Sequence, residues 1–386
     1  MLYIDITSVS FFLLIAATVL FLIQIYYFLG PYSRLYKCNR KQNRLPDNIN
    51  CPPLSVILVT KDSTTSLKEN LPMILEQDYP DFEVIVVNDE SAGEDEDILK
   101  ILETKYHNLY HTFIPKSARY ISRKKLGIAM GIKASRHDWI VLTEPYCKPE
   151  NKDWLRNMAR NFTPGTDIVL GYCNYNSSKG LFAKRIVSDL LLNSMRFLGR
   201  AIGNATYMGI GRNMAFRKEV YEQHKGFSKQ LQLLRGEDDL FINEIANNRN
   251  TKVEASSQSI MRMPLPENKS TWKGEKISYE VTGKLYKGYA RLSNSFETWT
   301  AVLFNLSVSA CIVWSILNKE WIITSTAAVL LITRLSTAMT VLGKTSKAMG
   351  EKLKSYFFIY LLLRPLHGIS LKWRYITRNK TDYMRK

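Results

Sequence analysis

Residues 54–60 of this chain are LSVILVT and residues 82–88 are FEVIVVN, two short apolar runs rich in β-branched side chains. Turn-forming residues bound both runs, as expected for strands that are covered on both faces of a sheet. Between them, residues 66–77 place four apolar side chains on one side of a helix: Leu67, Leu71, Ile74 and Leu75. The sequence therefore predicts a strand–helix–strand unit that begins at residue 54.

The same alternation continues downstream. Residues 124–135 (KKLGIAMGIKAS) have a helical pattern, and residues 139–143 (WIVLT) are typical of the next strand. Strands that alternate with helices in this way indicate an α/β domain with a Rossmann-like order. In such sheets, ligands bind beyond the carboxyl ends of the strands. Neither a GxGxxG nor a Walker A sequence is present, which argues against a dinucleotide or P-loop site.

Acidic residues follow the predicted strands at the ends where a ligand is expected. Asp62 follows the first strand, Asp89 the second and Glu144 the third. Further along, an apolar helix (LFINEIA) is preceded by three consecutive acids: Glu237, Asp238 and Asp239. Each acid alone is consistent with a helix cap or a solvated loop. Together they predict a site that holds a sugar hydroxyl, a divalent ion and a catalytic base.

An apolar block precedes this domain. Residues 8–29 are SVSFFLLIAATVLFLIQIYYFL, without charge, which is long enough to cross a hydrocarbon core of about 30 Å. A cleaved signal peptide is the alternative. No basic residue precedes the run and no small-x-small cleavage site follows it, so we expect a retained anchor.

A second apolar block predicts a transmembrane hairpin. Residues 299–318 carry no charge, Lys319 and Glu320 interrupt the block, and residues 321–343 contain only Arg334 as a charge. We expect Arg334 to snorkel or to face the other helices, and contact with an anionic lipid phosphate is the alternative. Residues 356–363 (YFFIYLLL) are too short to span and have basic neighbours, which predicts a helix lying in the interface.

The basic residues predict the orientation of the chain. The segment after the first helix and the C-terminal tail are both basic, and the positive-inside rule places both in the cytoplasm. We therefore expect a multi-pass protein of the inner (cytoplasmic) membrane. Its predicted parts are an anchor (1–33), a basic juxtamembrane linker (34–51), a cytoplasmic α/β domain (52–296), a helical hairpin (297–345) and a basic interfacial helix with a tail (346–386).

Composition excludes several other classes of protein. The chain has 53 Lys and Arg against 35 Asp and Glu, a net charge of +18. Much of this excess lies beside the predicted membrane helices and no nucleic-acid motif is present, so we expect no nucleic-acid partner. With 46% hydrophobic and 11% aromatic residues, the chain is not intrinsically disordered. Its five scattered cysteines form no CxxC pair, which argues against a disulfide framework or a zinc ribbon.

Residues 54–239 and the layout around them resemble a membrane-bound family 2 glycosyltransferase of bacterial type, with the GT-A fold. The resemblance rests on five stretches in the family's order: LSVILVTKD (54–62), NLPMILEQDYPDFEVIVVNDES (70–91), KKLGIAMGIKAS (124–135), GIGRNMAFRKEVYEQHKGF (209–227) and GEDDLFINEIA (236–246). It implies a nucleotide-sugar-binding GT-A domain between one N-terminal and two C-terminal transmembrane helices. It also implies inverting, hexosyltransferase-type transfer from a nucleotide-sugar donor, with UDP as the expected nucleotide.

The resemblance further implies roles for individual residues. The donor-binding residues would be Thr60 and Asp62 at the nucleobase, Asp89 at the uracil or ribose, Lys124 near the diphosphate, and Glu144 on the first acid of the family's Asp-x-Asp motif. The acceptor-side residues would be Gly211, Arg212 and Asn213. The catalytic residues would be Asp238, Glu237 and Asp239, with Asp238 as the general base that takes a proton from the acceptor hydroxyl.

Two departures from the family pattern affect the donor phosphates. Tyr146 stands where the Asp-x-Asp motif has its second acid, and a phenol is a poor ligand for a hard cation. The Gln-x-x-Arg-Trp signature is absent, and residues 272–279 keep only an aromatic and basic character. The resemblance implies a divalent cation, Mg²⁺ or Mn²⁺, bound in part by Glu144. With Tyr146 in place, either Lys and Arg replace some of the metal charge or transfer is lost.

The sequence therefore predicts a glycosyltransferase of cell-envelope polysaccharide or glycolipid biosynthesis. Its expected acceptor is a lipid, a lipid-linked molecule or a glycan at the cytoplasmic face of the membrane. The alternative is a catalytically degenerate GT-A module, which binds a nucleotide sugar or a partner transferase without turnover.

Overall fold

The computed structural model describes residues 7–45, 50–89, 93–117, 121–176 and 180–353, together with Tyr360, Leu361, Arg364, Gly368 and Trp373. Its strands are β1 (Leu54–Thr60), β2 (Phe82–Asn88), β3 (Leu109–Phe113), β4 (Trp139–Leu142), β5 (Lys148–Pro149), β6 (Ile168–Gly171), β7 (Cys173–Tyr175), β8 (Met214–Arg217), β9 (Thr251–Glu254) and β10 (Met261–Met263).

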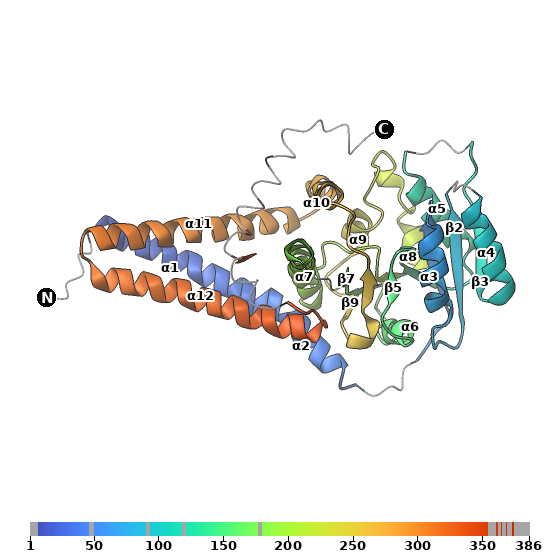
Figure 1. Ribbon diagram of the computed structural model, residues 1–386, viewed down its shortest axis with the longest axis horizontal. Helices are drawn as coiled ribbons and strands as arrows, with labels where there is room; N and C mark the ends of the chain where they lie inside the picture. The colour runs from blue at the N-terminus through green and yellow to red at the C-terminus, as the bar shows by residue number, and fades with distance from the viewer. Residues whose placement is uncertain are drawn as a thin grey trace.

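Its α-helices are α1 (Val9–Tyr27), α2 (Ser33–Gln42), α3 (Thr64–Leu75), α4 (Glu94–Lys105), α5 (Arg123–Ala134), α6 (Trp154–Ala159), α7 (Leu181–Ile202), α8 (Lys218–Gln223), α9 (Asp239–Ile245), α10 (Lys269–Gly283), α11 (Ala290–Leu317) and α12 (Trp321–Ala348). Three short helical segments complete the described structure: η1 (Phe28–Tyr32), η2 (Ser228–Gln230) and η3 (Ser257–Ser259). Three long apolar helices extend from one side of a mixed α/β domain (Figure 1).

The α/β domain is built on a sheet with the strand order β3-β2-β1-β4-β8-β6-β9. Strands β3, β2, β1 and β4 are parallel, whereas β8 runs antiparallel to both β4 and β6. A second, smaller sheet has the order β5-β10-β7. The predicted α/β class is confirmed, and the predicted strand bounds 54–60 and 82–88 coincide with β1 and β2.

Helix α5 lies close against this sheet because two of its residues lack side chains. A Cβ atom at Gly127 would approach the Val59 side chain to 2.8 Å, and one at Gly131 would approach the Ile57 side chain to 2.6 Å. Side chains at these positions would push the helix away from the core. The close packing places the first turn of α5 at the carboxyl end of β1, as in other βαβ units.

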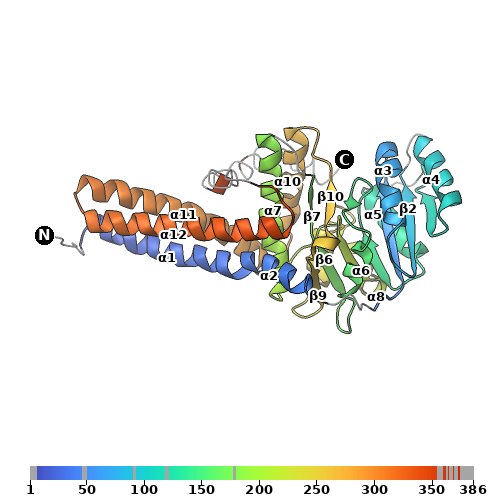
Figure 2. The same ribbon diagram turned by 60° about the horizontal axis from the view of Figure 1, so that its bottom comes forward.

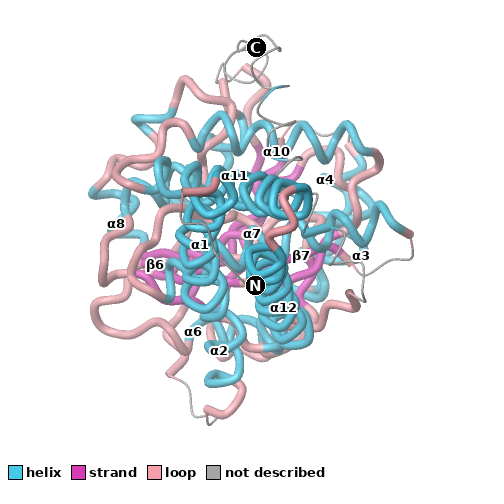
Figure 3. The backbone as a smooth tube through the Cα atoms, turned by 90° about the vertical axis from the view of Figure 1, so that its left-hand side faces the viewer, coloured by secondary structure: helices cyan, strands magenta, loops and turns pink. Residues whose placement is uncertain are grey.

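In the described part of the chain, three helices are long and apolar enough to cross a membrane: Val9–Gln42, Ala290–Leu317 and Trp321–Ala348. Viewed end-on in Figure 3, α1, α11 and α12 lie side by side in one bundle, and Ala17, Phe304 and Ile323 belong to its buried core. A turn at residues 318–320 joins α11 to α12, and Lys319 adopts a φ of +61° in it. The predicted short turn is therefore present, although α11 begins within the segment expected to belong to the α/β domain.

The first apolar helix continues into the segment for which we expected a linker. Gly30, with a ψ of −105°, and Pro31 interrupt the regular hydrogen bonding at the π-helical η1. Helix α2 then packs on α7 and buries Leu35 completely. Figure 2 shows α7 between the bundle and the central sheet. Within the expected interfacial helix at 356–363 the structure describes Tyr360 and Leu361, and the rest of that helix and most of the basic tail lie outside the described residues.

Candidate active site

The parallel strands end at one edge of the sheet, and the predicted donor residues lie there. Thr60 is the last residue of β1, Asp89 directly follows β2, and Glu144 follows β4. The backbone N–H of Asp89 donates to the carbonyl oxygen of Thr60 at 2.7 Å, so the ends of the first two strands are adjacent. The structure therefore brings these three residues together, as the parallel order requires.

The loop after β1 is organised by Asp95 of α4, which the sequence analysis missed. Its carboxylate accepts hydrogen bonds from the Ser63 N–H at 3.0 Å and from the Thr64 hydroxyl at 2.6 Å. Asp62 lies exposed in this loop with a φ of +46°, a conformation that Asp adopts more readily than most residues. Thr60 is fully buried, so Asp62 is the member of the predicted nucleobase pair that reaches the surface.

Asp89 forms an ion pair with Arg123, the first residue of α5. Arg123 was not among the predicted site residues, although it directly precedes Lys124. A donor group that contacts the Asp89 carboxylate would therefore also lie close to a guanidinium. The N-terminus of a helix attracts anions, and here two cationic side chains add to that attraction.

Lys124 lies between two buried carboxylates. Its Nζ forms an ion pair with Glu144 and lies 3.0 Å from Oε1 of Glu237, while 39% of the Lys124 side chain remains exposed. Burial alone would lower the pKa of Lys124, but the two carboxylates outweigh it and hold that pKa well above its usual value. Burial would likewise raise the pKa of Glu237, and the Lys124 charge lowers it on balance. Lys124 and Glu237 are therefore both charged at neutral pH.

Tyr146 is held by the predicted acceptor residue Arg212. The Nε of Arg212 donates to the Tyr146 hydroxyl at 3.3 Å, and its terminal nitrogen forms an ion pair with Glu275 of α10. Burial raises the pKa of the Tyr146 phenol, which remains protonated, and Arg212 only partly counteracts this shift. The position expected for a second acid thus holds a neutral phenol beside a guanidinium.

Asp238 caps α9, and both of its carboxylate oxygens accept hydrogen bonds. Oδ1 accepts from the N–H of Asp239 at 2.7 Å, and Oδ2 accepts from the Gly211 N–H at 3.1 Å and the Tyr279 hydroxyl at 2.9 Å. A Cβ atom at Gly211 would lie 3.4 Å from the Cβ of Asp238, so the backbone of this loop passes directly beside the acid. The predicted acceptor loop and the predicted base are therefore in direct contact.

Asp239 faces a different set of partners from α10 and the loop after it. Its Oδ2 accepts hydrogen bonds from the Thr282 hydroxyl and, at 2.8 Å, from the Tyr286 hydroxyl. Burial, together with the nearby charge of Asp238, raises the pKa of Asp239 to about 7. The two neighbouring acids thus differ: Asp238 contacts the predicted acceptor loop, and Asp239 anchors the helix beside it.

Lys125 holds the loop that leads into these acids. Its Nζ donates to three backbone carbonyl oxygens, those of Gln230 at 2.6 Å, Leu233 at 2.8 Å and Arg235 at 2.8 Å. The residue is only 2% exposed, and burial lowers the pKa of its ammonium to about 8. The two adjacent lysines of α5 therefore have different partners: Lys124 forms ion pairs with carboxylates, and Lys125 donates hydrogen bonds to backbone carbonyl oxygens.

Asn213 was predicted to lie on the acceptor side, but its side chain makes hydrogen bonds that stabilise the fold. Its amide nitrogen donates to the carbonyl oxygens of Tyr172 at 2.9 Å and Ser259 at 3.0 Å, and its oxygen accepts from the Trp154 indole at 3.0 Å. With 1% of its surface exposed, Asn213 ties the two sheets together. A direct acceptor contact by its side chain would require these hydrogen bonds to break.

Helix α10 and the turn after it supply site residues that the motifs did not identify. Glu275, Tyr279, Thr282 and Tyr286 contact Arg212, Asp238 or Asp239. Their spacing of four, three and four residues is that of one helical face, which is the signal present in the sequence. The segment expected to carry the missing signature thus contacts the acids, with different residues.

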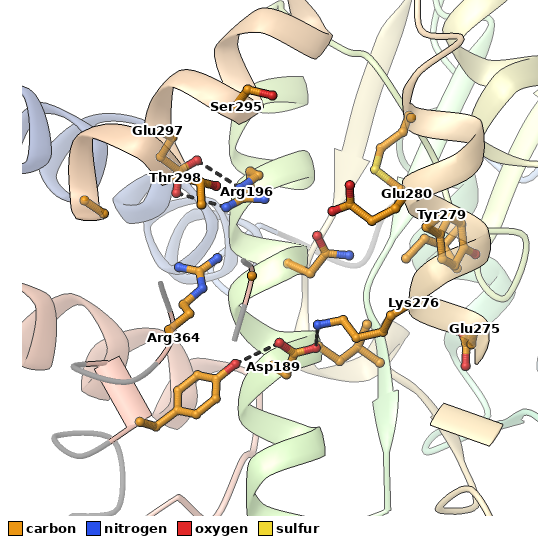
Figure 4. Close-up of a pocket in the computed structure, with 18 of the residues that line it drawn as sticks. Asp189, Arg196, Glu275, Lys276, Tyr279, Glu280, Ser295, Glu297, Thr298 and Arg364 are labelled. Atoms are coloured by element: carbon orange, nitrogen blue, oxygen red, sulfur yellow. Dashed lines mark hydrogen bonds and ion pairs between the residues drawn. The ribbon is translucent and has the colours of Figure 1, made fainter. Parts of the chain in front are cut away.

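A cavity of about 700 Å³ joins these residues to the apolar helices. Its lining includes Arg212 and Tyr279 of the α/β domain and Gln24 and Arg334 of the bundle. Figure 4 shows Lys276 paired with Asp189 on one wall, and Glu297 with Arg196 on another. Among the described residues, ten Lys or Arg side chains line the cavity against four carboxylates: Asp189, Glu275, Glu280 and Glu297. The cavity therefore carries an excess of positive charge.

The described residues do not by themselves form a divalent-metal site. Within these ranges, no group of three or more His, Cys, Asp or Glu side chains is arranged to hold a metal ion. Glu144 and Glu237 have the right chemistry, and Oε2 of Glu237 is buried without a hydrogen-bond partner, but the ammonium of Lys124 lies between them. Oxygen ligands suit Mg²⁺ or Mn²⁺, whereas an ammonium in their midst does not.

Comparison with known proteins gives the family. The family model described as Glycosyl transferase family 21 matches residues 16–374. No curated protein matches the chain. A solved structure, the mannosyltransferase PcManGT from Pyrobaculum calidifontis in complex with GDP-Man and Mn²⁺, has a TM-score of 0.52 and 16% sequence identity, over 87% of this chain and 98% of that chain.

At this identity the structural likeness concerns the fold alone. The prediction of a glycosyltransferase is confirmed, whereas the finer assignment to family 2 remains a prediction. The family match covers the α/β domain and all three apolar helices, from within α1 to beyond α12. The chain belongs to glycosyl transferase family 21.

Proposed function

We propose that this glycosyltransferase moves a sugar, with inversion, from a nucleotide-sugar donor to a lipid acceptor at the cytoplasmic face of the inner membrane. One observation carries the proposal. The Asp238 carboxylate accepts a hydrogen bond from Tyr279, and Tyr279 lines the cavity that extends to the apolar helices. A base beside such a cavity suits a substrate that arrives from the membrane.

The carboxyl edge of the parallel strands is the proposed donor side. Asp89 and Arg123 would offer hydrogen-bond partners to a ribose or nucleobase, with Thr60 beside Asp89 and Asp62 in the loop that follows β1. Lys124, in the first turn of α5, supplies positive charge for the diphosphate. UDP is the nucleotide that we expect from the resemblance of the site motifs, and GDP is the alternative to be tested.

In the proposed reaction Asp238 takes the proton of the acceptor hydroxyl as that oxygen attacks the anomeric carbon of the sugar. The new carbon–oxygen bond forms on the face opposite the leaving group, and the bond to the nucleoside diphosphate breaks. Lys124 and Arg212, which pair with Glu144 and Glu275, would offset the negative charge that develops on the leaving diphosphate. Asp239 fixes α10 beside Asp238 and takes no part in the proton transfer.

The divalent cation remains part of the proposal in a limited form. PcManGT is a neighbour in fold whose structure contains Mn²⁺. In this chain, Glu144 and Glu237 would contact such an ion only if the Lys124 ammonium moved. When bound, the ion would add positive charge beside the donor diphosphate. The proton transfer to Asp238 does not require it.

The competing function is a GT-A module that binds a nucleotide sugar or a partner transferase without turnover. Tyr146 favours it, because a neutral phenol held by Arg212 replaces an expected acid. Calorimetry with UDP and GDP, with and without Mn²⁺, distinguishes the two functions. Metal-independent binding without turnover supports the module, and binding strengthened by Mn²⁺ with turnover supports the enzyme.

The test of the proposed function uses the full chain, purified in detergent. The protein is given radiolabelled UDP- and GDP-sugars together with extracted membrane lipids, and lipid-soluble label is measured. We expect Asp238→Asn to lower transfer by a factor of about 10² to 10⁴, the usual contribution of a general base. Glu222→Gln, on the exposed helix α8, is the matched control and retains full activity. If wild type transfers sugar and Asp238→Asn transfers it at the same rate, Asp238 is not the base.

A further inference from the structure

Arg334 is a charged residue buried within an apolar helix. It lies near the middle of α12 with 5% of its surface exposed. Its guanidinium stacks over the Phe304 ring at 4.9 Å and donates to Oε1 of Gln24 at 3.2 Å. Arg334 therefore faces the other helices, as expected from the sequence.

These contacts leave the Arg334 charge without a counter-charge. Its Nε is buried with no hydrogen-bond partner, and in the part of the chain that the structure describes no carboxylate forms an ion pair with it. An amide oxygen and an aromatic face offset only part of the cost of burying a guanidinium. Charged residues retained inside membrane segments generally mark the path or the binding site of a ligand.

A second guanidinium lies beside the first. Arg364 lines the same cavity and donates to the Tyr32 hydroxyl at 3.4 Å, and its charge repels that of Arg334. The neighbouring carboxylate of Glu297 is already bound to Arg196 at 2.9 Å and to Tyr32. Arg364 points toward this pair in Figure 4. Arg196, Arg334 and Arg364 thus all line the bundle side of the cavity, and the carboxylate of Glu297 is paired with Arg196.

We propose that Arg334 and Arg364 bind the phosphate group of a membrane lipid, and that this phosphate-bearing lipid is the acceptor. The inference rests on the proposed function and names the class of its acceptor. Guanidinium groups donate paired hydrogen bonds to phosphate oxygens, and a phosphate would neutralise the excess charge of the cluster. The phosphate would also give the buried Nε of Arg334 an acceptor.

The position of the cluster favours a lipid over free phosphate as the source of this group. Arg334 and Gln24 belong to helices long enough to span a membrane, and the same cavity is lined by Phe28, Ala301 and Leu361. Acyl chains would lie against such apolar walls, while the polar headgroup extends along the cavity toward Tyr279 and Asp238. A hydroxyl in that headgroup is then the nucleophile.

The test measures binding without requiring turnover. Calorimetry on the full chain in neutral detergent compares dioctanoyl phosphatidylglycerol, dioctanoylglycerol and inorganic phosphate. We expect phosphatidylglycerol to bind at least ten-fold more tightly than the other two probes. Arg334→Gln and Arg364→Gln should each weaken phosphatidylglycerol by about ten-fold or more, and Arg334→Lys by less. Lys347→Gln, an equal change of charge at an exposed position of α12, should leave the affinity unchanged.

Three results would overturn the inference: equal affinity for the lipid without phosphate, equal affinity for inorganic phosphate, or unchanged affinity in both glutamine variants. Binding of UDP shows which variants remain folded, and each of the two variants tests the site on its own. A transfer assay with the same lipids separates the two proposals. If phosphatidylglycerol binds through Arg334 but receives no sugar, the phosphate site is supported and its role in binding the acceptor is refuted. If sugar is transferred equally to dioctanoylglycerol, the phosphate site does not select the acceptor, and the proposed transferase activity still holds.

Discussion

Replacing Lys125 by Met tests whether the acid-bearing loop depends on one buried ammonium. Lys125 donates to the carbonyl oxygens of Gln230, Leu233 and Arg235 at 2.6–2.8 Å. Met has similar length and no donor, so the three carbonyls would lose their partner. Lys133→Met is the control, because Lys133 lies on the same helix and is exposed.

The magnitude follows from two opposing contributions. One buried carbonyl, that of Gln230, and two part-buried ones, those of Leu233 and Arg235, cost about 2 kcal/mol each without a donor. Removing a buried charge whose pKa is lowered from 10.5 to about 8 returns about 3 kcal/mol. The net loss of about 3 kcal/mol corresponds to a fall of about 6–12 °C in the melting temperature of a domain of this size.

The assay is thermal unfolding of the full chain in detergent, followed by intrinsic fluorescence at pH 7 and at pH 9.5. Because the folded pKa is below the unfolded value, the unfolded chain retains the proton between pH 8 and 10.5, and stability due to Lys125 rises with pH in that window. Lys125→Met should lose this increase. A melting temperature within 2 °C of that of Lys133→Met, with the same pH dependence as wild type, would refute the role assigned to Lys125.

Two further perturbations test the acids. In Lys124→Met the carboxylates of Glu144 and Glu237 lose the ammonium between them, so Mn²⁺ should strengthen UDP binding more than in wild type; equal enhancement by calorimetry would contradict this. Burial and the charge of Asp238 raise the pKa of Asp239 from 3.8 to about 7. Between pH 3.8 and 7, the folded protein therefore binds a proton at Asp239 that the unfolded chain does not bind. The free energy of unfolding should therefore fall as the pH rises from 5 to 7, and it should depend less on pH in Asp239→Asn. Chemical denaturation measures both pH profiles, and parallel profiles for wild type and variant would rule this out.

The strands and the apolar helices were predictable from the sequence because their signals are local. A run such as residues 54–60 has few structural alternatives when nearly every side chain is apolar, and β1 and β2 have the expected bounds. Length and lack of charge likewise identified the three apolar helices. The parallel order then implied that Thr60, Asp89 and Glu144 share an edge.

Helix α2 illustrates a limit of local signals. Its basic residues predicted a linker, because charge dominates the composition of this segment. The helix forms there because Leu35 finds a buried position against α7, a partner distant in sequence. An amphipathic pattern in a short basic segment predicts a helix only when the surface on which the helix packs is known.

Composition and motifs determined that this chain has an α/β domain, three apolar helices and an acidic set at the carboxyl ends of the strands. Tertiary structure alone decided which charges meet: Lys124 between Glu144 and Glu237, Lys125 on three carbonyls, and Arg334 without a carboxylate in the described chain. Periodicity and hydropathy report the environment of one segment at a time. The energy of a buried charge depends instead on the atoms within a few ångströms of it, and folding brings those atoms from distant segments.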